Sequence, residues 1–389
     1  MLIFHGWNKM CGIASLINYD GSYIDSIKSS LFHRGPDAQT HFHDKNLHLI
    51  HTRLSIQDIK NGDQPYRIGK YIIIFNGEIY NHLELRKSIK NYTFKTLSDT
   101  ETLLALYIEY GYKSLEMLDG MFAFVIYNMK DNKLVFSRDR VGKKPIYFYK
   151  NDSQFFLASE LNTITRLLPN LLINEQSISS YLRVGFFHER TTPFREVEEV
   201  SPGFIYELDI NTLEIKKTQY FNIINQYKSP ITISHQDALV KLDSILNKSV
   251  RDRLLSSDLD VGAFLSGGID SSLIVAIASK YVENIKTFTV KFPGVYDESV
   301  IARRTAEKFR TNHHELQVSI NLKDDIEKIL NAFGEPFMDS SAIPSYYVSR
   351  EAKKNVTVVL NGDGADEIFA GYRRYVPFAN NWLKYVQYF

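Results

Sequence analysis

The stretch FLSGGIDSS, Phe264 to Ser272, restricts the fold of this chain more than any other feature of the sequence. It joins the buried-strand run DVGAFL to the apolar helix pattern SLIVAIASK, and its turn holds two glycines and three serines. Backbone N–H groups, hydroxyls and the positive end of the following helix together suit an anion such as a phosphate. Because no lysine follows, the stretch is not the G-x-x-x-x-G-K-[ST] loop. It predicts a parallel sheet with a ligand site at the carboxyl ends of its strands.

The sequence around this loop predicts an α/β domain. Strand and helix patterns alternate beyond residue 230, which is typical of βαβ units and a parallel sheet. The expected helices are 235–255, 271–282 and 297–309, and the expected strands are 260–266, 285–292 and 356–362.

The first half of the chain is β-rich instead. Short apolar runs such as YIIIFNG and GMFAFVIYN are separated by Gly, Asn and Asp turn signals. Two helices are expected, one from Leu83 to Lys90 with Asn81 as its N-cap, the other capped by Asp99 and ending at Gly111. We therefore predict two domains, an α+β domain over residues 11–220 and an α/β domain over residues 230–389.

A second group of charged residues, in LNGDGADE, follows the strand VTVVL. Asp363, Asp366 and Glu367 stand among glycines at the carboxyl end of that strand. Asp270 within an anion-binding loop would by itself repel a phosphate, so we expect a Mg²⁺ ion to bridge it to phosphate oxygens. Asp366 is the expected second ligand of that ion.

Cys11 is the only cysteine and directly follows Met10. A single cysteine excludes an internal disulfide and favours a reducing, cytoplasmic setting. A lone cysteine is usually a small buried hydrophobe, but Met-Cys-Gly-Ile also fits an initiator methionine before a catalytic cysteine. A free α-amine, with a pKa near ~8, could accept the thiol proton. We therefore expect that translation starts at Met10 or that residues 1–10 are removed.

The first half also supplies residues suited to glutamine hydrolysis. Asn76 and the Gly77 N–H group can donate to an oxyanion, Arg53 suits an α-carboxylate, and Asp99 or Glu78 suits an α-ammonium group. Each has a structural alternative as well: a surface arginine, a helix cap, or a hairpin turn at Asn76-Gly77.

SGGIDSS with the downstream GDGADE resembles the ATP-pyrophosphatase loop of the glutamine-dependent asparagine synthetases and their relatives. FHRGPD, HTRLSIQD, FNGEIYNH and SDTE resemble the glutaminase domain of the same family. The resemblance implies an N-terminal-nucleophile (Ntn) hydrolase sandwich followed by an ATP-pyrophosphatase domain of the adenine nucleotide alpha hydrolase type. It also implies a ligase of asparagine biosynthesis, in which glutamine hydrolysis is coupled to ATP-dependent adenylation and amidation of aspartate.

The resemblance further assigns residues to roles. Cys11, Asn76, Gly77 and Asp363 would be catalytic, with Asp363 beside the acyl-adenylate. Mg²⁺ would be held by Asp270 and Asp366. Glutamine would contact Arg53, Leu54, Ser55, Ile56, Gln57, Asn76, Gly77, Glu78 and Asp99. ATP would contact Leu265, Ser266, Gly267, Gly268, Asp270, Ser271, Ser272, Val290, Asn361 and Gly362.

Two alternatives stay open. Family members continue well past the GDGADE-type turn, whereas 23 residues follow Asp366 here, so we expect an incomplete synthetase domain. The chain would then be a truncated remnant with glutaminase activity at most. The other alternative is a related amidotransferase for another carboxylate, such as a sugar acid. The resemblance places the acceptor at the segment from Glu335 to Ser349, where Ser340 and Ser341 could contact it, and relatives that amidate other carboxylates have a segment of the same style.

The sequence does not indicate a nucleic acid or a membrane as a partner. The net charge of +1 gives no argument for nucleic acid, and no apolar run approaches the ~18 residues of a membrane span. A homodimer is left open. The histidines at 41, 43, 48 and 51 are expected to lie on strands rather than to hold zinc.

Overall fold

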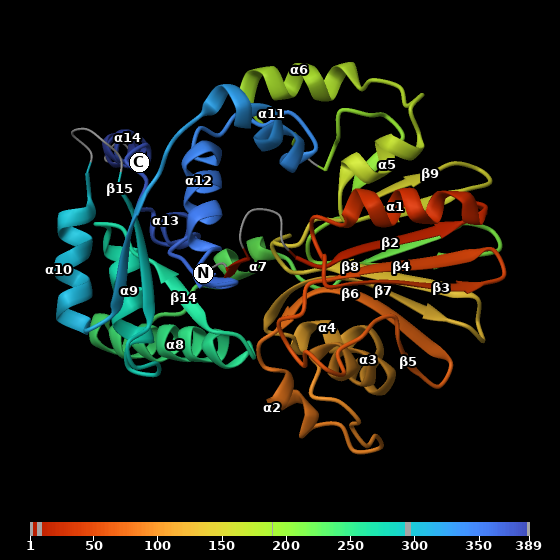
Figure 1. The fold of residues 1–389 in the computed structure, drawn as a ribbon, viewed down its shortest axis with the longest axis horizontal. Coiled ribbons are helices and arrows are strands. Elements are labelled where there is room, and N and C mark those ends of the chain that lie inside the picture. The colour runs from red at the N-terminus through yellow and green to blue at the C-terminus, as the bar shows by residue number, and fades with distance from the viewer. Residues whose placement is uncertain (1–2, 6–9, 189, 292–296, 387–389) are drawn as a thin grey trace. The chain divides into compact units, whose positions relative to one another are not determined.

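The computed structural model describes residues 3–5, 10–188, 190–291 and 297–386. The chain divides into two compact units, each described by itself below (Figure 1). The first comprises Asn8–Leu239 and Asn321–Pro344, and the second comprises Met1–Trp7, Val240–Ile320 and Ser345–Phe389. Residues 6–9 of the segment expected to be removed, and Phe292 of a predicted strand, lie outside the described residues. Within the described ranges, no helix is both long enough and apolar enough to span a membrane.

Two antiparallel sheets of six strands each form the centre of the first unit. In spatial order the first sheet contains β11 (Val197–Glu199), β9 (Tyr147–Lys150), β10 (Phe155–Ala158), β2 (Gly12–Ile17), β4 (Leu47–Arg53) and β3 (Ala38–Asp44). The second contains β13 (Ile215–Gln219), β12 (Phe204–Asp209), β8 (Lys133–Arg138), β7 (Gly120–Asn128), β6 (Tyr71–Ile79) and β5 (Tyr66–Ile68).

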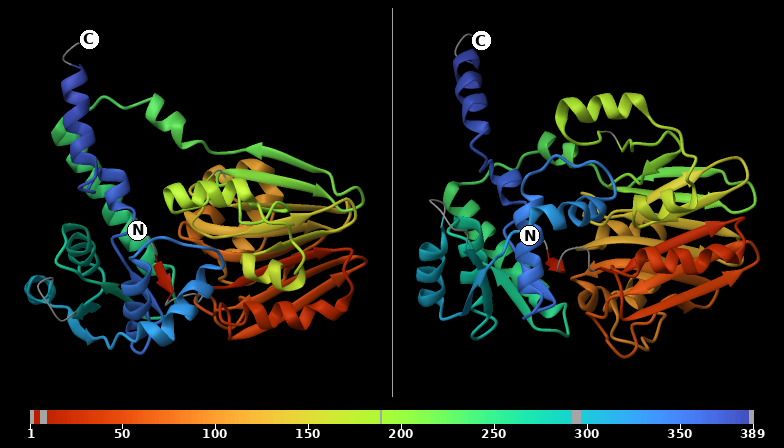
Figure 2. Two further views of the ribbon diagram at one scale, coloured as in Figure 1. Left: turned by 90° about the horizontal axis from the view of Figure 1, so that it is seen from above. Right: turned by 45° about the horizontal axis from the view of Figure 1, so that its top comes forward.

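Helices cover the outer face of each sheet, as the views in Figures 1 and 2 show. On the first sheet lie α1 (Ile24–Leu31) and α5 (Leu161–Leu167). On the second lies α3 (Asp99–Tyr110), with α2 (His82–Arg86) and α4 (Ser114–Met117) beside it. The result is a helix–sheet–sheet–helix sandwich, as expected for the first domain. The unit also contains η1 (Gly21–Tyr23), η2 (Gly111–Lys113), α6 (Glu175–Val184), α7 (Ile223–Lys228) and α11 (Leu322–Phe333).

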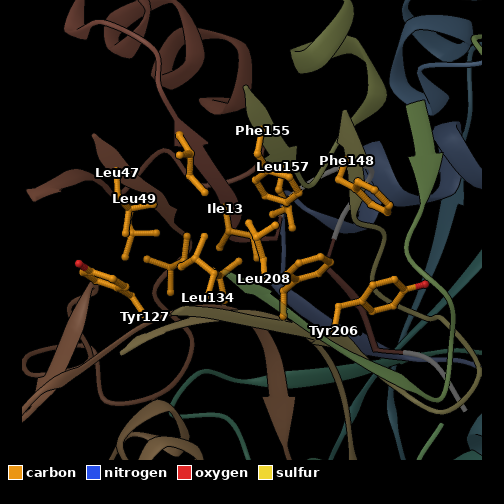
Figure 3. Packing of buried hydrophobic residues seen from close by; sticks show 14 of the residues in the cluster. Ile13, Leu47, Leu49, Tyr127, Leu134, Phe148, Phe155, Leu157, Tyr206 and Leu208 are labelled. Atoms are coloured by element: carbon orange, nitrogen blue, oxygen red, sulfur yellow. The ribbon is translucent and has the colours of Figure 1, made fainter. Parts of the chain in front are cut away.

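The central strands are buried on both faces, which explains their unbroken apolar runs. Side chains alternate between the two faces of a strand. In β2, Ile13 and Ile17 point into the core between the sheets, where Figure 3 shows Ile13. Ala14 and Leu16 of the same strand pack into the core beneath α1. Each strand of this kind therefore ties one helical layer to the other sheet.

Both helices predicted in this unit form, and Asn81 is the N-cap residue of α2 as predicted, whereas the N-cap of α3 differs from the prediction. Helix α2 is shorter than expected, and the Asn81 side chain bonds Met117 O and the Asp119 N–H group instead of an N–H group of the helix. Helix α3 is capped by Ser98, whose hydroxyl accepts from the Thr100 N–H group. Asp99 is the first helical residue, and its carboxylate bonds the distant strand β6.

The four histidines lie on β3 and β4, as predicted. His41 Nε2 is 3.0 Å from His48 Nδ1, and His48 Nε2 is 3.2 Å from Tyr19 O. His51 is fully buried, and burial lowers its pKa to about 3.

The second unit is built on the predicted parallel sheet. Its spatial order is β1 (Ile3–His5), β17 (Val358–Leu360), β14 (Val261–Phe264), β15 (Lys286–Lys291) and β16 (Asn312–Gln317). All neighbours are parallel except β1, which pairs antiparallel with β17 at the edge. The helices are α8 (His235–Leu255), α9 (Ile269–Ala278), α10 (Ser299–Phe309), α12 (Ala342–Ala352), α13 (Ala365–Phe369) and α14 (Tyr375–Val386). Two of them, α8 and α12, begin in residues of the first unit.

Candidate functional site

Cys11 immediately precedes β2 and lies against the residue that follows β4. Its Sγ is 3.4 Å from the Leu54 nitrogen, which donates to it, and 3.7 Å from Leu54 O. Antiparallel pairing of Gly12 with Thr52 fixes this contact. A Cβ atom on Gly12 would come within 2.5 Å of Thr52 Oγ1, so the position requires glycine.

The electrostatic surroundings of the thiol are mixed. Burial raises the pKa of Cys11, while the hydrogen bond from Leu54 and the charges of Arg53, Lys144 and Arg34 oppose that shift. The nitrogen of Cys11 is part of the peptide bond to Met10, and an amide nitrogen is no base. A thiol of raised pKa therefore needs another proton acceptor before it can attack.

Asn76, Gly77 and Glu78 lie inside strand β6 and not in a hairpin turn. Gly77 pairs with Phe122 of β7, and a Cβ atom at Gly77 would come within 2.2 Å of Met121 O. The Asn76 side chain is 1% exposed, and its Nδ2 has no hydrogen-bond partner among the described residues. An unsatisfied buried donor costs about 1–3 kcal/mol. The Asn76 Nδ2 group could therefore donate a hydrogen bond to a bound ligand.

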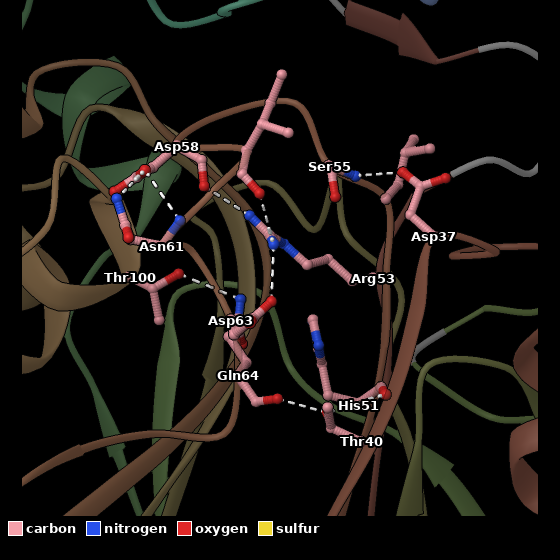
Figure 4. Close-up of polar contacts among 12 residues, drawn as sticks. Asp37, Thr40, His51, Arg53, Ser55, Asp58, Asn61, Asp63, Gln64 and Thr100 are labelled. Atoms are coloured by element: carbon pink, nitrogen blue, oxygen red, sulfur yellow. Dashed lines mark hydrogen bonds and ion pairs between the residues drawn. The ribbon is translucent and has the colours of Figure 1, made fainter.

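Arg53 is buried and is not a surface residue. Its Nη2 donates to Asp58 O at 2.7 Å, and its Nη1 donates to Ile59 O at 3.2 Å and Asp63 Oδ1 at 2.8 Å (Figure 4). The Asp63 side chain is 70% exposed. A solvent-exposed carboxylate thus occupies the position on Arg53 that a substrate carboxylate could take.

The residues that follow Arg53 form the wall of the same region. Leu54 and Ile56 are buried. The Ser55 N–H group donates to Asp37 at 2.7 Å (Figure 4), and Gln57 Oε1 accepts from the Asp99 N–H group at 3.2 Å. Gln57 therefore links this wall to the start of α3.

Asp99 is 5% exposed, and its Oδ2 accepts from the Ile79 N–H group at 2.9 Å. Burial, together with the nearby Glu78 carboxylate, raises the pKa of Asp99 to about 7. A ligand that carries an ammonium group would stabilise the anionic form of Asp99.

Two basic residues near Cys11 were not assigned a role from the sequence. Arg34 Nε donates to Cys11 O at 3.2 Å, and its Nη1 pairs with Glu160 at 2.8 Å. Lys144 is 2% exposed and lies against Met10. Arg34 lies in FHRGPD, one of the stretches that carry the resemblance, and this was the signal that could have pointed to it.

In the second unit, the stretch FLSGGIDSS forms the predicted strand–loop–helix. Ser266 and Ser271 hydroxyls are 2.8 Å apart, and the Gly268 N–H group donates to Ser266 Oγ at 3.1 Å. The Ser272 hydroxyl lies in the first turn of α9 and donates to Gly268 O at 2.8 Å. The Gly267 N–H group donates to Glu298 Oε2 at 2.9 Å. Glu298, which precedes α10, had no predicted role.

The two predicted loops of this unit meet because β14 and β17 are parallel neighbours, with Ala263 opposite Leu360. A Cβ atom on Gly362 would lie 3.0 Å from Asp270 Cβ. Leu265 is buried, and its N–H group donates to Phe288 O on β15, the strand that also carries Val290.

Asp363 and Asp366, the acidic residues that follow β17, have different surroundings. Asn361 Nδ2 donates to Asp363 Oδ2 at 2.8 Å, and burial raises the pKa of Asp363. Asp366 lies in α13 with its carboxylate against Gly371, and the described contacts do not join it to Asp270. Among the described residues, no group of three His, Cys, Asp or Glu side chains is arranged to hold a metal ion. Asp270 lies in the predicted phosphate loop, and a single carboxylate there suits Mg²⁺, which usually takes its remaining ligands from phosphates and water.

Comparisons with known proteins agree with this two-part layout. Residues 10–221 match the glutamine amidotransferase domain family, and residues 241–388 match the asparagine synthase family. The chain is 37% identical over 387 residues to asparagine synthetase [glutamine-hydrolyzing] 1 of Bacillus subtilis, covering 94% of this chain and 59% of that protein. It is 33% identical to putative asparagine synthetase [glutamine-hydrolyzing] 2 of Methanocaldococcus jannaschii, covering 93% of this chain and 76% of that protein.

Among solved structures, glutamine phosphoribosylpyrophosphate amidotransferase of B. subtilis is a distant neighbour. The TM-score is 0.40 at 16% identity, covering 85% of this chain and 94% of that one.

Proposed function

Because the chain belongs to the glutamine-hydrolysing asparagine synthetase family, we propose that it releases ammonia from glutamine and uses it to amidate a carboxylate at the expense of ATP. Aspartate is the acceptor we favour, which makes the enzyme an asparagine synthetase. The observation that supports the glutamine step most directly is the buried Asn76 Nδ2 group, which has no hydrogen-bond partner among the described residues.

In the glutamine reaction, the α-amine of Cys11 accepts the thiol proton, and Sγ attacks the carboxamide carbon. Asn76 Nδ2 and the Gly77 N–H group donate to the oxyanion. The protonated amine then gives its proton to the departing ammonia, and water hydrolyses the thioester. The amine must therefore be free of the peptide bond to Met10.

The substrate glutamine would be held at both ends. Its α-carboxylate would take the place of Asp63 on Arg53, and its α-ammonium group would neutralise Asp99 and Glu78. The wall from Leu54 through Ser55 and Ile56 to Gln57 would enclose the side chain.

In the synthetase reaction, the acceptor carboxylate attacks the α-phosphorus of ATP and expels pyrophosphate. Ammonia then attacks the acyl carbon, and AMP leaves. Ser266, Ser271 and Ser272, with the N–H groups of Gly267 and Gly268, would bind the phosphates. Leu265, Val290, Asn361 and Gly362 would contact the nucleoside, and Asp363 would lie beside the acyl-adenylate.

Mg²⁺ would neutralise the phosphates between Asp270 and Asp366. The close approach of Asp270 to Gly362 supports this arrangement because it brings the two loops together.

Ser340 and Ser341 are the residues we expect to contact the acceptor. The substrates are intracellular metabolites, and we place the enzyme in the cytoplasm, without nucleic-acid or membrane partners. Self-association as a homodimer is tested by light scattering.

The test is pyrophosphate release by the purified chain with ATP and Mg²⁺. Release that requires both aspartate and a nitrogen source, either glutamine or ammonia, would support asparagine synthesis. Release with a sugar acid but not with aspartate would move the acceptor assignment to another carboxylate. Glutamine hydrolysis without any pyrophosphate release would reduce the proposal to a glutaminase.

A further inference from the structure

Lys144 is a buried cation to which the proposed glutamine reaction gives no task. It lies between β8 and β9 and is 2% exposed. Its Nζ is 2.6 Å from Met10 Sδ, its hydrogen-bond partner in the described part of the chain. A thioether sulfur is a weak acceptor that carries no charge. The ammonium group of Lys144 is therefore poorly compensated, and it lies against the residue directly before Cys11.

The other cations around Cys11 are paired. Arg34, which follows α1, binds Glu160, and Arg53 at the end of β4 binds Asp63. Among the described ion pairs, Lys144 has none. The carboxylates of Glu78 and Asp139 lie within its electrostatic range, as do Arg34 and Cys11. Of these three cations, Lys144 is therefore the one for which no described carboxylate contact offsets the electrostatic effect on Cys11.

The backbone fixes this arrangement. Asp139 Oδ2 accepts from the N–H groups of Lys144, at 3.0 Å, and Phe122, at 3.2 Å, so the loop is tied to β7. Burial lowers the pKa of Lys144 to about 8, which leaves the side chain charged at neutral pH.

We propose that Lys144 is a positioning residue for the nucleophile: in the chain with a free Cys11, its charge holds the α-amine of Cys11 in the neutral form that accepts the thiol proton. This inference rests on the proposed glutamine hydrolysis. An α-amine with a pKa near ~8 is mostly protonated at pH 7, and a like charge nearby disfavours the protonated form. Removal of Met10 takes away the sulfur against which Lys144 lies and leaves its ammonium group within electrostatic range of Cys11, which then carries the new amine.

The test compares three chains that begin at Cys11, verified by intact mass: the wild type, Lys144→Arg and Lys144→Met. We measure kcat/KM for glutamine hydrolysis from about pH 5.5 to about pH 9. We expect the acidic limb of the Lys144→Met profile to move up by about one pH unit, whereas Lys144→Arg keeps the wild-type position. An unmoved limb in Lys144→Met, whatever its total activity, would overturn the proposal.

A second measurement requires no turnover. Cys11 is the only cysteine, so the pH dependence of iodoacetamide alkylation reports its thiolate alone. We expect the alkylation midpoint to rise in Lys144→Met and not in Lys144→Arg. If Lys144→Met shows no cooperative thermal transition, Lys144→Gln takes its place under the same criteria. Equal midpoints in all folded variants would refute the inference.

The two proposals can fail separately. A wild-type chain with a free Cys11 that hydrolyses no glutamine would refute the proposed glutaminase. The alkylation profiles would still decide whether Lys144 controls the ionisation of Cys11.

Discussion

The carboxylate of Glu298 occupies a backbone donor of the predicted phosphate loop: its Oε2 accepts a hydrogen bond from the Gly267 N–H group at 2.9 Å. An incoming phosphate that uses the same donor must displace this carboxylate and overcome its charge. In the chain without nucleotide, Glu298 therefore occupies a backbone donor that ATP would use, and the two compete for it when ATP binds.

We expect Glu298→Ala to bind ATP more tightly by about three- to tenfold, because a typical intramolecular hydrogen bond contributes about 0.5–1.5 kcal/mol net, and about 1.4 kcal/mol is tenfold in affinity. Glu298→Gln, which keeps a neutral acceptor, should lie between this variant and the wild type. Isothermal titration with ATP and Mg²⁺ measures the effect. Glu307→Ala, on the helix α10 that Glu298 precedes, is the matched control, since Glu307 is exposed. Weaker binding by Glu298→Ala would contradict the competition.

Asp99 gives a second prediction, on stability. Its pKa is raised to about 7 in the fold, so the folded chain retains a proton that the unfolded chain releases above about pH 4. The free energy of unfolding of the wild type should therefore fall as the pH rises from about 4 to about 7. We expect Asp99→Asn, whose amide oxygen can still accept from Ile79, to exceed the wild type by about 1–3 kcal/mol at pH 7.5 and to match it at about pH 4.

Urea denaturation at the two pH values measures this difference. The same variant should raise the KM for glutamine at least about tenfold, because a carboxylate partner of the α-ammonium group is lost. A stability difference that does not change with pH would show that Asp99 is ionised in the fold.

His51 should act in the opposite direction. The folded chain keeps it neutral, with a pKa of about 3, whereas the unfolded chain binds a proton below about pH 6.5. Its contribution to stability is complete above about pH 6.5 and is lost as the pH falls toward about 3. Relative to His51→Gln, the wild type should lose roughly 2–3 kcal/mol between about pH 7 and about pH 4.5. His235→Gln, at the exposed start of α8, controls for the loss of one histidine; if it changes the acid slope as much as His51→Gln does, burial is not the cause.

These residues show what sequence patterns can and cannot predict. The β-rich half, the parallel sheet and the loop at Phe264 to Ser272 follow from local periodicity and turn chemistry, and they form as predicted. Asp99 looked like a helix cap because position alone favoured that role, but a backbone N–H group from β6 takes its carboxylate. The strand β16, with the polar sequence NHHELQ, gave no apolar signal.

The contact partners of charged residues could not be predicted from the sequence for a similar reason. Glu298 is 31 positions from Gly267, and Lys144 is 134 positions from Met10. Only the assembled sheets bring such pairs together. Likewise, residues 321–344, which contain Ser340 and Ser341, belong to the first compact unit although they follow the phosphate loop in sequence.

The assignment of one reaction to each of the two units gives a fourth prediction. Cys11→Ala should abolish synthesis with glutamine but leave synthesis with ammonia intact, because ammonia bypasses the thiol. Asp270→Asn should do the reverse, retaining glutamine hydrolysis and losing pyrophosphate release. Paired assays of glutamate and pyrophosphate measure both. If each variant, still folded, lost both activities, the assignment of one reaction to each unit would be wrong.

The peptide bond before Cys11 gives the last prediction. In the chain with Met10 attached, the nitrogen of Cys11 is an amide, and burial raises the pKa of the thiol. Without a nearby base, the thiolate fraction at pH 7 is small, and we expect glutamine hydrolysis at least about a hundredfold below that of the chain that begins at Cys11.

The comparison requires intact-mass analysis of both preparations. The matched control is synthesis with ammonia, which does not use Cys11 and should be equal in the two chains. A preparation that retains residues 1–10 by mass yet hydrolyses glutamine at the full rate would show that another group, such as Lys144 in its neutral form, accepts the thiol proton. The free amine would then be unnecessary.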